Sequence, residues 1–126
     1  MTPHIFVYGT LRPGEPAFHR WLGGQAVEHR PARLADHALF GVTFRYPFVV
    51  PDPGFVVIGD VVTVPGVVIE ETLARLDGYE GPEYVRREVA VEPERGDPVQ
   101  AWTYVAFPDV ELPDSERIPS GDWRSR

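Results

Sequence analysis

Proline and glycine interrupt this chain so often that long helices have little room to form. The 126 residues include 14 prolines and 12 glycines, spread along the whole sequence. Both residue types end regular elements, and the short segments that remain between them favour strands. A chain of this length suits one domain (residues 1–126), and we expect a polar, extended C-terminal tail from about residue 108.

Most of the intervening segments have strand patterns. Residues 4–8 predict a short buried strand, and residues 25–35, 37–42 and 47–50 predict three more. Residues 55–64 are apolar on both faces, which is typical of a central or barrel strand. Two further segments, 84–92 and 99–107, are predicted to pair as a hairpin.

One segment has a clear helical period. Ile69, Leu73 and Leu76 are spaced to lie on one face of a helix over about residues 67–77, which Gly78 is expected to end. Several short strands with one good helix predict an α+β fold with a closed or strongly curved sheet.

Composition excludes several classes of enzyme. The chain has no cysteine and no lysine, so it can form no disulfide, thiolate nucleophile or Schiff base. Its three serines all lie in the tail, outside any nucleophile elbow. The four histidines lack metal-ligand spacing. We therefore expect no metal and no cofactor.

The charge and hydropathy patterns limit the kinds of partner that the chain is expected to bind. A net charge of -7 without a basic patch argues against nucleic acid and anionic membranes. No apolar run approaches the roughly 20 residues of a membrane span, and no signal peptide is visible. The lack of cysteine fits a reducing compartment, so a cytoplasmic protein is expected. The sequence leaves its oligomeric state open.

The turn after the first strand is a candidate binding site. It consists of Tyr8, Gly9, Thr10 and Leu11. A strand that ends in a glycine turn exposes successive backbone N–H groups, which can hold a carboxylate or phosphate, and Gly9 would let a ligand approach closely. The alternative is an ordinary strand-end turn with Tyr8 in the core.

A second candidate is Glu80, which follows the predicted helix between two glycines. In an apolar cavity its pKa would rise, and the carboxyl group would become an acid/base near neutral pH. The alternatives are a solvated turn residue and the rival carboxylate Asp77, which we expect to be a helix-end or turn-capping residue.

Together the two segments resemble the gamma-glutamylcyclotransferase-like family, with YGTLxxG at residues 8–14 and LDxYEGxxYxR at residues 76–86. Shorter matches at 46–51, 59–60 and 120–123 extend the resemblance over most of the chain. The YGTL form is particularly similar to the gamma-glutamylamine branch and to small bacterial relatives. Thr10, where other branches carry Ser, and Asp60, where many relatives carry Glu, leave the substrate open.

The resemblance implies a small mixed β-barrel with short helices packed outside it. It also implies a reaction in which a gamma-glutamyl group cyclises to 5-oxoproline and releases its amine. The substrate's own α-amino group is the nucleophile, Glu80 transfers the protons, and the amides of residues 8–11 hold the α-carboxylate beside the Tyr8 ring. Tyr84 and Arg86 are given only a supporting role. Strand packing is an equally good interpretation of Tyr84, and a surface ion pair is an equally good interpretation of Arg86.

Two other functions use the same residues differently. The chain could be a non-catalytic binding module that holds an amino-acid-like metabolite in the same cavity. It could also be an interaction protein without a pocket, in which Glu80 would lie on the outer surface far from Tyr8. The sequence does not identify the amine that leaves.

Overall fold

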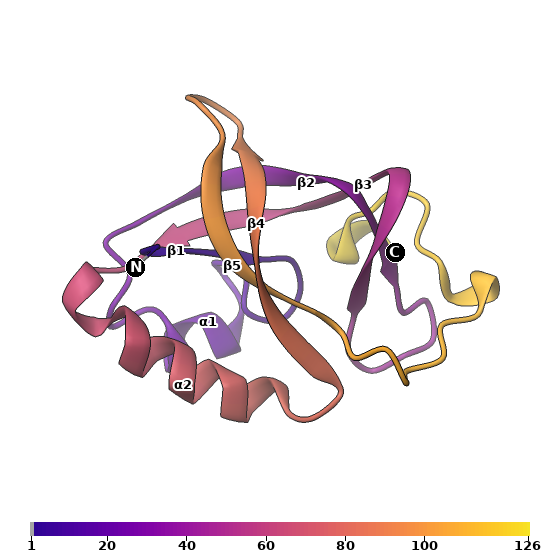
Figure 1. The fold of residues 1–126 in the computed structure, drawn as a ribbon, viewed down its shortest axis with the longest axis horizontal. Coiled ribbons are helices and arrows are strands. Elements are labelled where there is room, and N and C mark those ends of the chain that lie inside the picture. The colour runs from indigo at the N-terminus through magenta and orange to yellow at the C-terminus, as the bar shows by residue number, and fades with distance from the viewer. Residues whose placement is uncertain (1) are drawn as a thin grey trace.

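Five strands form a closed barrel in the computed structural model, which describes residues 2–126 (Figure 1). The order around the barrel is β1–β3–β2–β4–β5, and every neighbouring pair is antiparallel except β1 with β5, which is parallel. This confirms the predicted closed mixed barrel. The strands are β1 (His4–Val7), β2 (Glu28–Phe40), β3 (Phe48–Thr63), β4 (Tyr84–Pro93) and β5 (Val99–Ala106).

Two α-helices, α1 (Pro16–Trp21) and α2 (Ile69–Glu80), pack outside the barrel on the same side (Figure 1). Three short 3-10 turns complete the structure: η1 (Gly66–Val68), η2 (Asp114–Glu116) and η3 (Trp123–Ser125). Among residues 2–126, no helix has the length and apolar character needed to cross a membrane.

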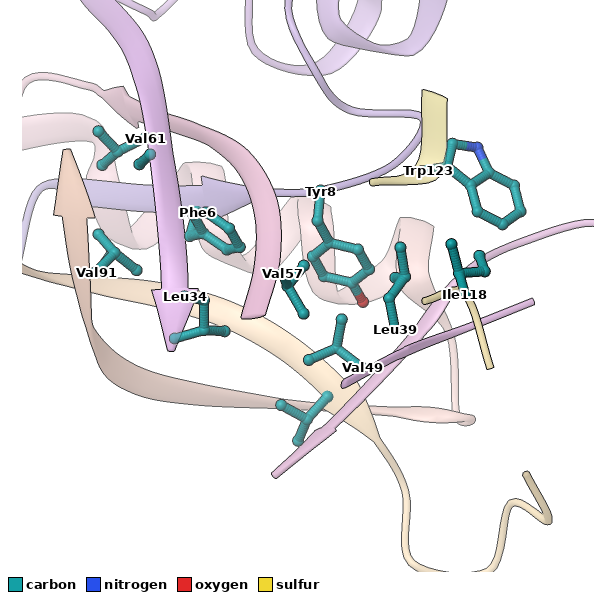
Figure 2. Packing of buried hydrophobic residues seen from close by; sticks show 13 residues of the cluster. Phe6, Tyr8, Leu34, Leu39, Val49, Val57, Val61, Val91, Ile118 and Trp123 are labelled. Atoms are coloured by element: carbon teal, nitrogen blue, oxygen red, sulfur yellow. The ribbon is translucent and has the colours of Figure 1, made fainter. Parts of the chain in front are cut away.

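The first strand, β1, is buried on both faces. Phe6 and, just beyond the strand, Tyr8 belong to the cluster inside the barrel (Figure 2), whereas Ile5 and Val7 pack in the layer under the helices. Fully burying a side chain of this size stabilises a fold by roughly 1.5–3 kcal/mol. A short strand fixed from both sides can therefore position the residues that follow it.

The structure corrects the prediction of separate strands over 25–35 and 37–42. β2 is one strand, and a bulge between Ala35 and His37 takes up Asp36. Asp36 has a φ of 57°, a left-handed conformation that aspartate adopts more readily than most residues. A bulge absorbs one unpaired residue without ending the strand, so the change in pattern does not mean a break.

A second correction concerns 47–50 and 55–64, which form the single strand β3. The PDPG sequence at 51–54 does not end it, because the register of β3 with β2 is interrupted there, opposite the Asp36 bulge. Proline is tolerated in a strand where a ladder hydrogen bond is missing. Gly54 N–H instead donates to the Asp36 carboxylate at 3.1 Å.

The helix α2 has the predicted buried face but a later end. Ile69, Leu73 and Leu76 are all buried, which confirms the predicted stripe. Gly78 does not end the helix, because a glycine inside a helix costs only about 1 kcal/mol relative to alanine. The helix ends at Gly81, whose φ is 84°. Glu80 is therefore the last helical residue, and not part of a loop as the sequence predicts.

Residues 108–126 lie against the ends of β2 and β3 (Figure 1). Ile118 N–H donates to Leu39 O, and Ile58 N–H donates to Gly121 O, each at 2.8 Å. Ile118 and Trp123 are buried within the barrel cluster (Figure 2). The segment thus adds side chains to the core that the strands enclose.

Trp123→Ala should lower the free energy of unfolding by about 3–5 kcal/mol, because the removed indole leaves a cavity beside the barrel core. Urea denaturation measures the change. Val67→Ala is the control, since Val67 is 94% exposed and should change stability by less than about 0.5 kcal/mol. Equal stability of Trp123→Ala and the unmodified protein would mean that the C-terminal segment lies outside the folded domain.

Candidate active site

A cavity of about 190 Å³ lies where β1 ends. Its walls come from β1 and the turn after it, the loop before β3, the end of α2, the start of β4, and β5. The lining includes every site residue predicted from the sequence: Tyr8, Gly9, Thr10, Leu11 and Glu80. Within residues 2–126, no group of three or more His, Asp or Glu side chains is arranged to hold a metal ion.

Glu80 is half-buried at the cavity wall, and this burial raises the pKa of its carboxyl group to about 7. No hydrogen bond or ion pair with a described residue stabilises the charged form of the Glu80 side chain. The partial negative charge at the C-terminal end of α2 opposes ionisation in the same direction. A carboxyl group with a pKa near neutrality can both accept and donate a proton.

The turn at residues 8–11 offers hydrogen-bond donors to the cavity. In the part of the chain that the structure describes, the N–H groups of Gly9, Thr10 and Leu11 have no protein acceptor. The N–H of Arg12 donates to Gly9 O at 3.1 Å and closes the turn. Successive backbone N–H groups in such a turn suit an anion such as a carboxylate.

Gly9 is needed for packing. A Cβ atom at Gly9 would lie 2.5 Å from Pro47 Cγ, so the absence of a side chain makes room for Pro47. Pro47 belongs to the loop between β2 and β3 and lines the same cavity. A larger residue at position 9 would push this wall away.

Two hydrogen bonds formed by hydroxyl groups fix the walls of the cavity. The Thr10 and Tyr79 hydroxyl oxygens are 3.0 Å apart, which joins the 8–11 turn to the residue before Glu80. The Tyr84 hydroxyl donates to Pro47 O at 2.7 Å and joins β4 to the loop before β3. Both bonds connect segments that are distant in sequence, so the cavity is held together from several sides.

Tyr8, Tyr84 and Tyr104, which lie near Glu80, stay protonated. Burial, with a further contribution from the negative charge of Glu80, raises the pKa of Tyr8 and of Tyr84. The pKa of Tyr104 is raised by burial, by its hydrogen bond to Asp77 and, more weakly, by Glu80. Tyr8 also donates its hydroxyl hydrogen to Tyr104 O at 2.7 Å. The cavity therefore places the Glu80 carboxyl group, with its raised pKa, beside three neutral phenols.

Asp77 fastens α2 to the barrel. Its carboxylate accepts a hydrogen bond from the Tyr104 hydroxyl at 2.6 Å and lies 3.5 Å from Arg86 Nε. Asp77 is not part of the cavity lining, and neither is Arg86, whose guanidinium lies over the Trp102 ring. The geometry supports a structural role for Asp77. Tyr84, in contrast, does line the cavity.

A buried ion-pair cluster lies next to the turn, and the sequence motifs do not predict it. Arg12 Nε lies 2.8 Å from the Asp60 carboxylate, and another guanidinium nitrogen of Arg12 lies 3.0 Å from Asp122. The cluster ties the 8–11 turn to β3 and to the C-terminal segment. One signal could have revealed it: Asp60 is an acidic residue within an otherwise apolar strand, where a buried charge needs a partner.

Comparisons with known proteins match most of the chain. The family model described as "Gamma-glutamyl cyclotransferase, AIG2-like" matches residues 5–125. A Drosophila melanogaster protein named "Putative gamma-glutamylcyclotransferase CG2811" is 32% identical over 123 residues, covering 89% of this chain and 76% of that protein.

Solved structures have the same fold. The crystal structure of YkqA from Bacillus subtilis matches with a TM-score of 0.70 and 27% identity over 98% of this chain. The chain spans only 40% of the length of YkqA. A crystal structure of an AIG2-like protein from Mus musculus matches with a TM-score of 0.67 and 27% identity, covering 94% of this chain and 89% of that protein.

Arg12→Gln should lower the free energy of unfolding by about 3 kcal/mol or more, because it leaves two acidic groups without their buried partner. Thermal or urea unfolding measures the loss. Arg33→Gln is the matched control: Arg33 pairs with Glu92, but both side chains are at least half exposed, so the expected loss is under about 1 kcal/mol. Equal losses in the two variants would contradict a structural role for the buried cluster.

The raised pKa of Glu80 predicts a pH-dependent stability. The folded protein binds this proton more tightly than the unfolded chain, so the contribution of Glu80 is complete below about pH 4.5 and is lost as the pH rises through about 7. A shift of this size corresponds to about 3 kcal/mol. We therefore expect the free energy of unfolding of Glu80→Gln to rise relative to that of the unmodified protein by this amount between pH 4.5 and pH 8.

Glu70→Gln, on the exposed first turn of α2, is the control for this measurement, and its stability difference should change little over the same range. A Glu80→Gln difference that is equally flat would mean that Glu80 titrates like a solvated side chain.

Proposed function

The chain belongs to the gamma-glutamyl cyclotransferase, AIG2-like family, and we propose that it is an enzyme that cyclises a gamma-glutamyl group to 5-oxoproline and releases the attached amine. Family membership supports gamma-glutamylcyclotransferase-type activity. One observation supports the specific reaction most strongly: Glu80, with a pKa of about 7, and the amides of the 8–11 turn line one cavity.

The reaction needs no nucleophile from the protein. The nitrogen of the substrate's α-amino group bonds to the carbon of its own γ-carbonyl and closes a five-membered lactam. The bond between that carbon and the leaving amine then breaks. Overall, one proton moves from the α-amino nitrogen to the leaving nitrogen, and no water is consumed. This chemistry suits a chain without cysteine or lysine and with serine only near its C-terminus.

Glu80 is the group proposed to move the proton. The α-ammonium group, whose ordinary pKa is about 8, first loses one proton to the solvent and becomes the free amine that attacks. As the new C–N bond forms, ionised Glu80 takes a further proton from the same nitrogen. In its protonated form it donates this proton to the leaving amine. A pKa of about 7 leaves both forms of Glu80 accessible near neutral pH, which suits a group that acts first as base and then as acid.

The 8–11 turn is proposed to hold the substrate's α-carboxylate. The unpaired amides of Gly9, Thr10 and Leu11 supply donors, and the Tyr8 ring forms part of the wall. Anchoring the carboxylate at one end would favour folded conformers that bring the α-amino group to the γ-carbonyl. Holding reacting groups in such a conformer can contribute several kcal/mol to lowering the barrier.

Glu80→Gln should fold normally yet lose 5-oxoproline release by about 10²-fold or more, because the amide cannot move the proton. Turnover of a panel of gamma-glutamyl compounds, followed by chromatography of 5-oxoproline, measures the loss. Glu70→Gln on the same helix is the matched control and should keep full turnover. Near-normal turnover by Glu80→Gln would refute its role.

Two further outcomes separate the alternatives. If Asp77→Asn abolished turnover without lowering stability, Asp77 would be the catalytic carboxylate instead. If the unmodified protein bound gamma-glutamyl compounds without forming 5-oxoproline, the cavity would belong to a binding module.

A further inference from the structure

A second, larger hollow adjoins the cavity that contains Glu80. This outer hollow has a volume of about 630 Å³ and is bounded by the loop before β3, the residues between α2 and β4, and the segment after β5. Tyr46 and Glu83 line both hollows. The outer hollow therefore lies next to the inner cavity, on the side formed by these two residues.

The walls of the outer hollow are tied down by hydrogen bonds. Glu116 accepts from the Thr43 N–H at 2.7 Å and from the Thr43 hydroxyl, and its own backbone oxygen accepts from Gly41 N–H at 2.7 Å. On the opposite wall, Phe107 N–H donates to Glu83 O at 2.8 Å. The two walls, residues 41–47 and 107–111, lie close together at the lower right of Figure 1.

The lining is rich in aromatic side chains. Phe44 meets Phe48 edge-to-face, with 5.9 Å between ring centroids, and Phe48 stacks at 4.8 Å on Tyr84 of the inner cavity. Phe107 and Tyr46 remain 41% and 48% exposed. Apolar surface gathered in a hollow is typical of a binding site, and aromatic rings gain from contact with another ring.

The charged groups of the outer hollow are mostly acidic. Glu83, Asp109 and Glu111 line it, against a single cation, Arg45, which lies over the Tyr46 ring. None of the four forms an ion pair with another residue of the described chain. A ligand with its own carboxylate would meet this negative field unfavourably, whereas a neutral aromatic group would not.

We infer that the outer hollow binds the leaving amine, and that the enzyme prefers gamma-glutamyl amides of aromatic amines that carry no carboxylate. This inference rests on the proposed function and specifies its substrate class. Dipeptides such as gamma-glutamyl amino acids present a carboxylate to the acidic wall and are the poorer substrates.

Three compounds test the inference by their kcat/KM for 5-oxoproline release: gamma-glutamyl phenethylamide, gamma-glutamyl ethylamide and gamma-glutamyl phenylalanine. The first two differ by the aromatic ring, and the first and third differ by one carboxylate. The phenethylamide should exceed the ethylamide by about tenfold or more, from contact with the aromatic wall. It should exceed the phenylalanine compound by a similar factor, from charge repulsion.

Variants test which residues of the outer hollow cause the preference for an aromatic ring and the preference against a carboxylate. Phe107→Ala should reduce the ratio of phenethylamide to ethylamide several-fold, whereas Phe55→Ala, a similarly exposed phenylalanine outside both hollows, should leave it unchanged. The double variant Asp109→Asn, Glu111→Gln should reduce the preference for phenethylamide over the phenylalanine compound. Glu94→Gln with Asp97→Asn, two exposed residues between β4 and β5, is its matched control.

The outcomes distinguish this inference from the proposed function. If all three compounds react with equal kcat/KM, or if the phenylalanine compound is the best substrate, the aromatic-amine preference is overturned and the cyclisation stands. If none of the three releases 5-oxoproline, the cyclisation fails and the inference fails with it.

Discussion

The burial of β1 on both faces determines where the candidate site can lie. Phe6 fills the barrel interior, while Ile5 and Val7 support the helices. The strand cannot shift without disturbing both layers, because protein interiors are closely packed. The turn at residues 8–11 is therefore fixed at one end of the barrel, next to the end of α2. Its position follows first from the packing of the strand that precedes it.

The same packing produces the electrostatics of the site. Glu80 projects from the end of α2 into a wall made of apolar and phenolic groups, and its pKa rises because its charged form loses contact with water. A group of this kind destabilises the fold at neutral pH, which is common where a residue serves function more than stability. The Arg12 cluster and the hydrogen bond between Thr10 and Tyr79 hold the opposing turn in place.

Much of the fold could be predicted from local pattern, and the rest depended on pairing between distant segments. The buried stripe of α2 and the double-sided burial of β3 over residues 59–62 follow from residue spacing, although Phe55 and Val56 of the same strand are exposed. The continuity of β2 and β3 does not follow from residue spacing. A proline-rich segment resembles a strand end unless its position opposite a bulge in the neighbouring strand is known. Beyond Gly78, Tyr79 of α2 contacts Thr10 and Trp21, and the local pattern does not show these contacts either. For the site, two motifs identified residues that the structure brings together, whereas the partners of Arg12 lie 48 and 110 positions away.

Binding of the product 5-oxoproline, followed by NMR at single residues, tests the central claim most directly. If the turn and the helix end form one site, added 5-oxoproline should shift the backbone amide signals of Gly9, Thr10 and Leu11 together with the side-chain carboxyl signal of Glu80, at one common dissociation constant. Shifts confined to another surface, or shifts of the turn without Glu80, would contradict the account.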